Sequence, residues 1–148
     1  MTLRVRTKGD TATLTLKVKD QKWETGASSR EFDFPITDAP QTLCLADYPA
    51  LTEELHTRVQ DLPDTLSCLG SLTTARTCFP LGVGNLTAEL DESRYFDCID
   101  YELECELPSK DEEPAVLNFL KNTFSLTPTQ GVCGKYHRFL NRWKKQGK

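Results

Sequence analysis

The sequence has no long hydrophobic run, and this excludes an ordinary membrane-spanning helix. Among its 148 residues there is no stretch of eighteen apolar residues, which is about the length that such a helix needs. The first ten residues, MTLRVRTKGD, also have no apolar segment of the kind found in a signal peptide. We therefore expect a cytoplasmic protein with no membrane partner.

Cysteine and histidine motifs for metal, redox or triad chemistry are also missing. The six cysteines never occur as C-x-x-C, which argues against a zinc site or a thioredoxin-like centre. Without a secretory signal, we expect six reduced and mostly buried thiols. The two histidines, His56 and His137, are not part of a Ser/His/Asp pattern, so triad catalysis has little support.

The composition indicates one globular domain with an uneven distribution of charge. The length suits a single domain, and 38% hydrophobic residues exclude a disordered chain. The net charge of −4 argues against a specific nucleic-acid partner. Residues 1–30 nevertheless hold seven basic and three acidic residues, whereas residues 89–113 hold eleven acidic and two basic ones. Blocks of opposite charge usually meet in the fold or on a ligand.

Alternating residues at the amino terminus predict a β-hairpin with one cationic face. Residues 3–8 and 13–19 each alternate apolar and polar side chains, and Gly9-Asp10 between them indicates a turn. The polar face then holds only cations and threonines, the cations being Arg4, Arg6, Lys8, Lys17 and Lys19. Residues 31–34 predict a further short strand.

The rest of the chain predicts more strands with helices between and after them. Further strands are expected over residues 69–79, 85–91 and 96–107, with a turn near 91–94. Helices are expected over residues 50–60, 115–126 and, within a basic segment, 133–145. The pattern favours an α+β fold around an antiparallel sheet or barrel.

Carboxylates cluster on one face of the later strands, and two interpretations of the charged faces stay open. The carboxylates are Glu89, Asp91, Asp100, Glu102, Glu104 and Glu106, with Arg76 on the strand before them. Either these faces are solvated, as is common in antiparallel sheets, or they line the inside of a barrel. In a barrel, arginine and lysine suit phosphate oxygens, and carboxylates suit Mg²⁺ or Mn²⁺. Glu102 and Glu104 share a face two residues apart, which lets both reach one ion.

The ordered motifs of the whole chain resemble the CYTH family of triphosphate tunnel metalloenzymes, and in particular its small bacterial members. In order along the chain, the motifs are L-R-V-R, T-L-K, L-T-T-A-R, A-E-L-D, D-Y-E-L-E-C-E and G-K-Y-H-R-F. Together they extend from Leu3 to about Phe139. The resemblance implies an antiparallel β-barrel that forms a tunnel, and hydrolysis or cyclisation of triphosphate compounds with a divalent metal.

The resemblance also assigns roles to individual residues. It implies that the triphosphate is bound by Arg4, Arg6, Lys17, Arg76, Lys135 and Arg138. Glu102 and Glu104 would be metal ligands. Asp91, or alternatively Glu89, would bind metal or position the attacking water, and Lys135 would act with Asp91 in catalysis. The implied cofactor is Mg²⁺ or Mn²⁺, and the implied ligand is a triphosphate or polyphosphate.

One signature of the family is absent, which leaves alternatives for both function and assembly. No Glu-x-Glu-x-Lys occurs in the chain, although the family has such a strand near its amino terminus. We therefore expect residues 1–148 to be one CYTH-like domain that is truncated at its amino terminus, with an open barrel. Its open strand edge offers a route to a homodimer. The function is either triphosphate hydrolysis or, alternatively, triphosphate binding without turnover or an adenylate cyclase-type reaction.

Overall fold

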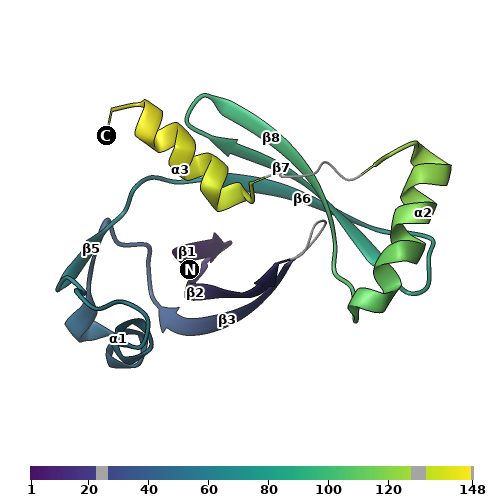
Figure 1. The fold of residues 1–148 in the computed structure, drawn as a ribbon. Coiled ribbons are helices and arrows are strands. Elements are labelled where there is room, and N and C mark those ends of the chain that lie inside the picture. Colours follow the sequence, from purple (N-terminus) through teal and green to yellow (C-terminus); the bar gives the residue numbers. More distant parts are fainter. Residues whose placement is uncertain (23–26, 128–132, 148) are drawn as a thin grey trace. The chain divides into compact units, whose positions relative to one another are not determined.

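Strands and helices alternate along the chain and form two compact units. The structure, a computed structural model, describes residues 1–22, 27–127 and 133–147. Unit 1 is Met1–Gly70 and unit 2 is Ser71–Lys148 (Figure 1). Antiparallel strands together with helices confirm the predicted α+β class. The described strands lie in three separate sheets and do not close into a barrel, which agrees with the open arrangement expected from the sequence.

Unit 1 is built on the predicted hairpin, extended by a third strand. The strands are β1 (Thr2–Lys8), β2 (Thr11–Lys22) and β3 (Ala27–Ile36), and β2 lies in the middle. Gly9 has a φ of +58°, a conformation that glycine adopts at little cost, so the chain reverses there as predicted. The pairing places Arg4 opposite Thr15 and Lys17 opposite Glu31, so all four belong to one polar face.

The other face of this sheet packs against α1 and a small second sheet. These elements are β4 (Thr42–Cys44), η1 (Leu45–Asp47), α1 (Pro49–His56) and β5 (Thr65–Ser67). The helix confirms the 50–60 prediction, whereas β4 and β5 were not predicted because each has only three residues. The core of unit 1 consists of buried leucines from all these parts, namely Leu14, Leu16, Leu43, Leu45, Leu51 and Leu55.

Unit 2 contains a three-stranded sheet in which charged residues of neighbouring strands lie opposite one another. The strands are β6 (Thr73–Pro80), β7 (Thr87–Tyr95) and β8 (Cys98–Cys105), with β7 central. The register aligns Arg76 with Asp91 and Asp91 with Glu102 in one row across the sheet. The turn expected at 91–94 is wrong: β7 runs through it, and the chain reverses at Phe96, whose φ is +51°.

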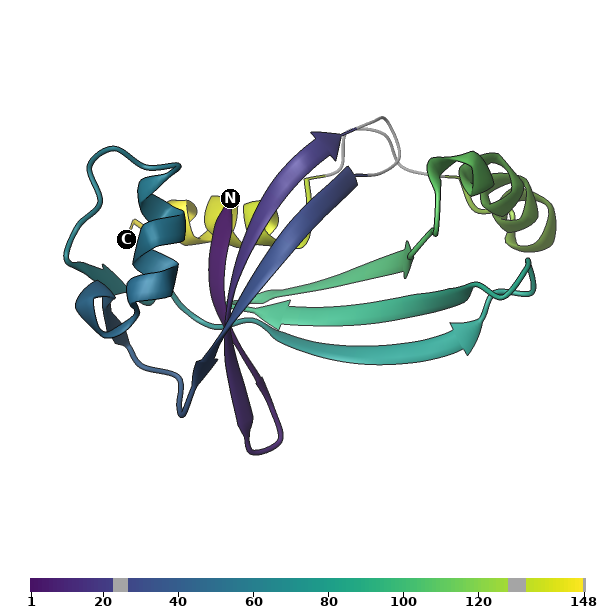
Figure 2. The same ribbon diagram turned by 90° about the horizontal axis from the view of Figure 1, so that it is seen from below.

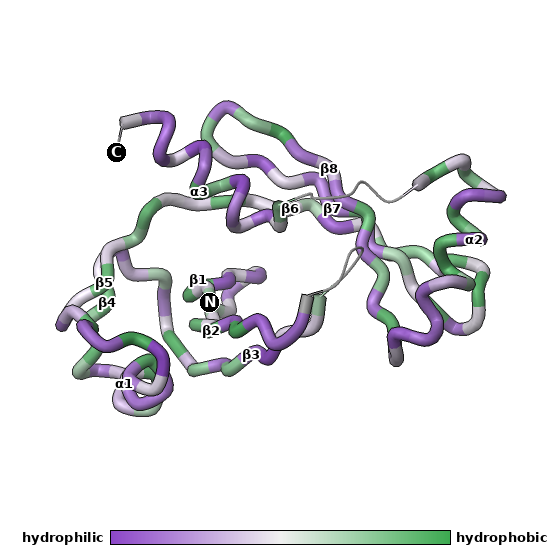
Figure 3. Tube along the Cα trace, viewed as in Figure 1, coloured by the Kyte–Doolittle hydropathy of each residue, from purple (hydrophilic) through white to green (hydrophobic). Residues whose placement is uncertain are grey.

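Two helices pack on different parts of this sheet. They are α2 (Glu113–Phe124), which follows the short η2 (Lys110–Glu112), and α3 (Lys135–Lys145). Val116 of α2 packs with Leu81, Leu86 and Ala88 in the core of unit 2. Figures 1 and 2 both show α2 at one end of the sheet and α3 nearer the β7–β8 turn. Hydrophilic residues predominate along α3 (Figure 3).

Two further expectations concern membranes and cysteines. None of the helices in the described part of the chain is long and apolar enough to span a bilayer. The six cysteines are free, but four are exposed and two are half-buried, so the expectation of mostly buried thiols is wrong. The cysteines of β6 and β8 lie on strands whose faces are open to solvent over part of their length.

We predict that truncating Leu16 destabilises unit 1 far more than truncating Leu69. Leu16 is 0% exposed and Leu69 is 39% exposed. Leu16→Ala leaves a cavity in the core, for which we expect a loss of about 2–5 kcal/mol. Leu69→Ala should cost less than about 0.5 kcal/mol. Urea denaturation of both variants measures the difference, and equal losses would contradict the assigned core.

Candidate functional site

On the polar face of unit 1, one carboxylate binds the cations that were predicted to be phosphate contacts. Glu31 accepts hydrogen bonds from Arg4 at 3.1 Å and from Lys17 at 2.8 Å. Arg6 lies 4.0 Å from the same carboxylate and is 58% exposed. The hydrogen bond from Lys17 is the main reason that the pKa of Glu31 is lowered. Sequence reasoning assigned only cations and threonines to the hairpin face and missed this anionic partner, which comes from β3.

A second carboxylate of β3 completes this face. Thr15, which is 2% exposed, donates a hydrogen bond of 2.6 Å to Asp33. Burial lowers the pKa of Arg4, and its buried Nε has no hydrogen-bond partner among the described residues. This face holds five cations, Arg4, Arg6, Lys8, Lys17 and Lys19, against the two carboxylates Glu31 and Asp33, so it keeps positive charge for an anion.

On the polar face of unit 2, Arg76 binds three carboxylates from the two neighbouring strands. Its guanidinium forms a bidentate pair with Asp91, with distances of 2.7 and 2.8 Å. It also bonds to Glu89, and to Glu104 at 3.2 Å. Hydrogen bonding to Asp91 is the main reason that the pKa of Arg76 is raised. The guanidinium therefore stays charged and is held among carboxylates of β7 and β8.

Helix α3 adds two cations to the same face. Lys135 lies 2.6 Å from Asp91 Oδ2 and 3.5 Å from Glu102 Oε2. Arg138 lies 2.7 Å from Asp100 and 2.9 Å from Glu102 Oε2. Burial lowers the pKa of Arg138, but its bonds to Asp100 and Glu102 outweigh this and raise it overall. Both α3 cations are thus held by carboxylates of β7 and β8.

The carboxylates of this face suit a divalent cation. In the structure, however, they are paired with arginine and lysine side chains and do not form a complete metal site. Five carboxylates, Glu89, Asp91, Asp100, Glu102 and Glu104, face three cations, so negative charge is in excess. Glu102 Oε2 is buried and is paired with Arg138 and Lys135, and carboxylate oxygens are the ligands that Mg²⁺ and Mn²⁺ prefer. In the described part of the chain, no three acidic, histidine or cysteine residues are grouped to hold an ion.

The structure brings the predicted site residues together within each unit. In unit 1, Arg4, Arg6 and Lys17 surround Glu31. In unit 2, the network joins Arg76, Asp91, Glu102, Glu104, Lys135 and Arg138.

Sequence reasoning missed several partners in these networks. In unit 1 the alternation of residues 31–34 held a signal, because Glu31 and Asp33 share one face of a strand. In unit 2, Tyr95 donates a hydrogen bond to Asp100, which in turn binds Arg138. The Tyr95 contact joins β7 to β8 across their antiparallel pairing, which alternation within a single strand does not show.

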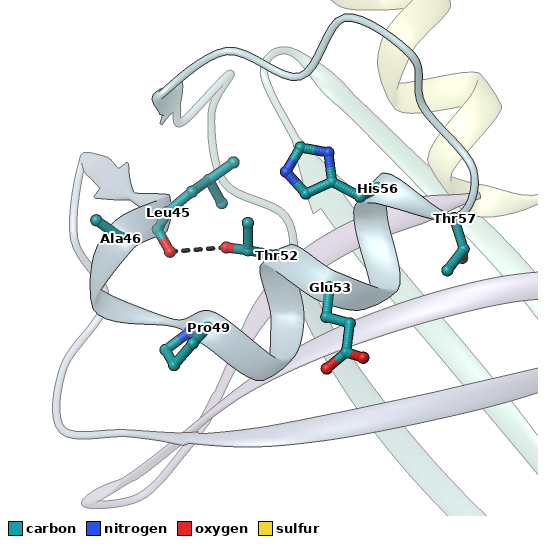
Figure 4. A pocket seen from close by; sticks show the side chains of 7 residues that line it. All are labelled: Leu45, Ala46, Pro49, Thr52, Glu53, His56 and Thr57. Atoms are coloured by element: carbon teal, nitrogen blue, oxygen red, sulfur yellow. Dashed lines mark hydrogen bonds between the residues drawn. The ribbon is translucent and has the colours of Figure 1, made fainter.

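A hollow over η1 and α1 in unit 1 contains none of the predicted site residues (Figure 4). It is lined by Leu45, Ala46, Pro49, Thr52, Glu53, His56 and Thr57. Thr52 is not available to a ligand as a donor, because its hydroxyl bonds to the backbone oxygen of Leu45 at 2.7 Å. The charged networks, rather than this hollow, are therefore the candidate functional site.

Comparison with known proteins shows the family of this chain. The family model described as CYTH domain matches residues 1–126, which cover most of the chain. The chain belongs to the CYTH domain family. A solved structure from Bacillus halodurans, described as a "putative adenylate cyclase", is 25% identical with a TM-score of 0.62. The match covers 93% of this chain and 71% of that one. A search of curated proteins found no match.

Membership of the CYTH family explains why charged residues occupy these strands. The family acts on triphosphate compounds and is generally metal-dependent, so its domains need both cations and carboxylates on their strands. The matched region includes β1, β2, β6, β7 and β8, which hold most of the residues identified above. Lys135 and Arg138 on α3 lie beyond the matched residues.

We predict that Asp91 makes unit 2 sensitive to acid. Hydrogen bonds from Arg76 are the main reason that the pKa of this carboxyl, which is 0% exposed, is lowered to about 2. Because the folded value lies below the unfolded one, the stabilisation is present above about pH 4 and is lost as the pH falls through about 2. The shift corresponds to about 2 kcal/mol.

Asp91→Asn is the variant that measures this contribution, since an amide does not titrate in this range. Between pH 5 and pH 2, the wild type should lose about 2 kcal/mol more unfolding free energy than the variant. Urea denaturation at a series of pH values gives both curves. Parallel curves would show that the Asp91 pairs do not stabilise the fold.

Proposed function

We propose that this CYTH domain hydrolyses a triphosphate compound, such as inorganic triphosphate, thiamine triphosphate or a nucleoside triphosphate, with Mg²⁺ or Mn²⁺. The observation that supports this most is the row Arg76, Asp91 and Glu102 on three adjacent strands. Arg76 is a cation suited to phosphate, and Asp91 and Glu102 are carboxylates suited to a metal ion. These two kinds of group thus lie side by side. Within unit 2 alone, these residues therefore offer groups of both kinds that a metal–triphosphate complex needs.

The cationic residues are proposed to bind the phosphates. Arg4, Arg6 and Lys17 form one group on unit 1, while Arg76, Lys135 and Arg138 form the other on unit 2. Arginine suits this task because its planar fork can bind two phosphate oxygens at once. Arg4 has a donor to spare, since its buried Nε has no hydrogen-bond partner in the described residues.

The carboxylates are proposed to hold the metal. Glu104 is 46% exposed and, among the residues that the structure describes, bonds to Arg76 alone at 3.2 Å, so one of its oxygens remains available. Glu102 supplies a buried oxygen that is paired with Arg138 and Lys135, and Asp91 is the third carboxylate of the set. A bound Mg²⁺ or Mn²⁺ would supply Lewis-acid stabilisation of phosphoryl oxygens.

In the proposed reaction, water attacks the terminal phosphorus and the remaining phosphate chain leaves. Charge accumulates on the transferred and leaving oxygens, where Arg76 and Lys135 would stabilise it. Asp91, or alternatively Glu89, would orient the water. The bidentate pair with Asp91 keeps the guanidinium of Arg76 from rotating away, so that its position is set before the substrate binds.

The family match also bears on the domain organisation that we propose. It runs through residues 1–126 and therefore through parts of both compact units. We propose that residues 1–148 act as one CYTH domain in the cytoplasm. The outer strands of the sheet in unit 2 are β6 and β8, and a homodimer through such an edge stays a prediction.

We predict phosphate release from tripolyphosphate that depends on Mg²⁺ or Mn²⁺ and on Glu104. Glu104→Gln keeps the size of the side chain but removes the charge proposed to hold the metal. Loss of one such electrostatic contact should lower the rate about 100-fold. The matched control is Glu92→Gln, which removes a charge from the opposite face of β7 and should keep the wild-type rate.

The same assay separates the alternative functions by their products. Equal release by the wild type and Glu104→Gln, or none by either, would contradict the hydrolase proposal. With ATP as substrate, cyclic AMP and diphosphate would indicate a cyclase, which the description of the Bacillus halodurans structure makes the second candidate. Tripolyphosphate that binds without turnover would indicate a binding domain.

A further inference from the structure

Helix α3 contacts the carboxylates of unit 2 through three cations on one of its sides. Lys135, Arg138 and Arg142 are spaced three and four residues apart, so they follow one side of the helix. Each pairs with a carboxylate of the β7–β8 hairpin: Lys135 with Asp91, Arg138 with Asp100, and Arg142 with Asp97. This side of α3 therefore faces the carboxylates of the β7–β8 hairpin.

Two of these cations converge on a single oxygen of a proposed metal ligand. Arg138 lies 2.9 Å and Lys135 lies 3.5 Å from Glu102 Oε2. Lys135 also lies 2.6 Å from Asp91 Oδ2. A metal ion on these two carboxylates would lie within a few ångströms of both cationic groups, and like charges at such distances repel strongly.

The carboxyl-terminal part of α3 is held by contacts that involve no proposed ligand. Phe139 is buried, with its ring 5.0 Å from that of Phe96 and 6.0 Å from that of Tyr95. Arg142 pairs with Asp97 in the β7–β8 turn. The ion pairs with Asp91 and Glu102 and the apolar contacts of Phe139 are therefore made by different residues of α3.

We propose that Lys135 and Arg138 occupy the Asp91 and Glu102 carboxylates in place of a divalent cation, so that metal binding requires the first turn of α3 to move. This rests on the proposed function for the choice of Asp91 and Glu102 as metal ligands. The displaced ammonium and guanidinium groups become available to phosphate oxygens. The carboxylates then bind the metal ion, and the cations that they released bind the triphosphate. Each ligand therefore favours binding of the other.

Trp143 provides a signal for this movement that does not depend on catalysis. It is half-buried on α3, and the only other tryptophan is Trp23. In a Trp23→Phe background, the emission of Trp143 should change and saturate as Mg²⁺ is added. Adding tripolyphosphate should lower the Mg²⁺ concentration at the midpoint, because the freed cations then have an anion to bind.

The decisive variant is Lys135→Gln, which removes a competing charge from the proposed metal site. It should bind Mg²⁺ about five- to tenfold more tightly in the absence of triphosphate, as expected for loss of a like charge near a protein surface. Lys144→Gln is the matched control on the same helix. Lys144 is exposed and makes no ion pair with any residue in the described ranges, so its removal should leave Mg²⁺ affinity unchanged.

The possible outcomes separate this proposal from the proposed function. Unchanged or weaker Mg²⁺ binding by Lys135→Gln overturns the proposal, whether or not the wild type releases phosphate. Tighter binding by this variant with no phosphate release by the wild type supports the proposal and contradicts hydrolysis. If Lys135→Gln fails to fold by circular dichroism, Arg138→Gln in the same titration decides, with the same expected direction.

Discussion

The carboxylate of Asp91 is buried on the central strand of unit 2 and binds two cations that are distant in sequence. Arg76 comes from the neighbouring strand and Lys135 from the last helix. An ionised group in such a place is costly unless each oxygen is hydrogen-bonded, and here both oxygens are. This one carboxylate thus joins three elements of unit 2, namely β6, β7 and α3.

Each charged face keeps an excess of one sign after its internal pairs are formed. The polar face of unit 1 has three more cations than carboxylates, and that of unit 2 has two more carboxylates than cations. Internal pairing lowers the cost of holding many charges on strands, and the excess leaves affinity for an outside ion.

Much of this organisation could be predicted from the sequence. Strict alternation over residues 3–8, 13–19 and 96–107 fixed which side chains share a face, and the structure confirms those strands. The ion pairs could not be predicted, because they depend on register between strands and on where α3 packs. Glu31 shows the reason clearly: its strand was recognised, but only its pairing with β2 places it beside Lys17.

The central claim is that the carboxylates of β7 and β8 exchange internal cations for a metal. Anomalous diffraction from crystals of the chain grown with Mn²⁺ and a non-hydrolysable triphosphate analogue tests it most directly. The account predicts Mn²⁺ bonded to oxygens of Asp91 and Glu102, with Lys135 no longer bonded to Asp91. Mn²⁺ bound elsewhere, or Lys135 still paired with Asp91 beside an occupied site, would contradict it.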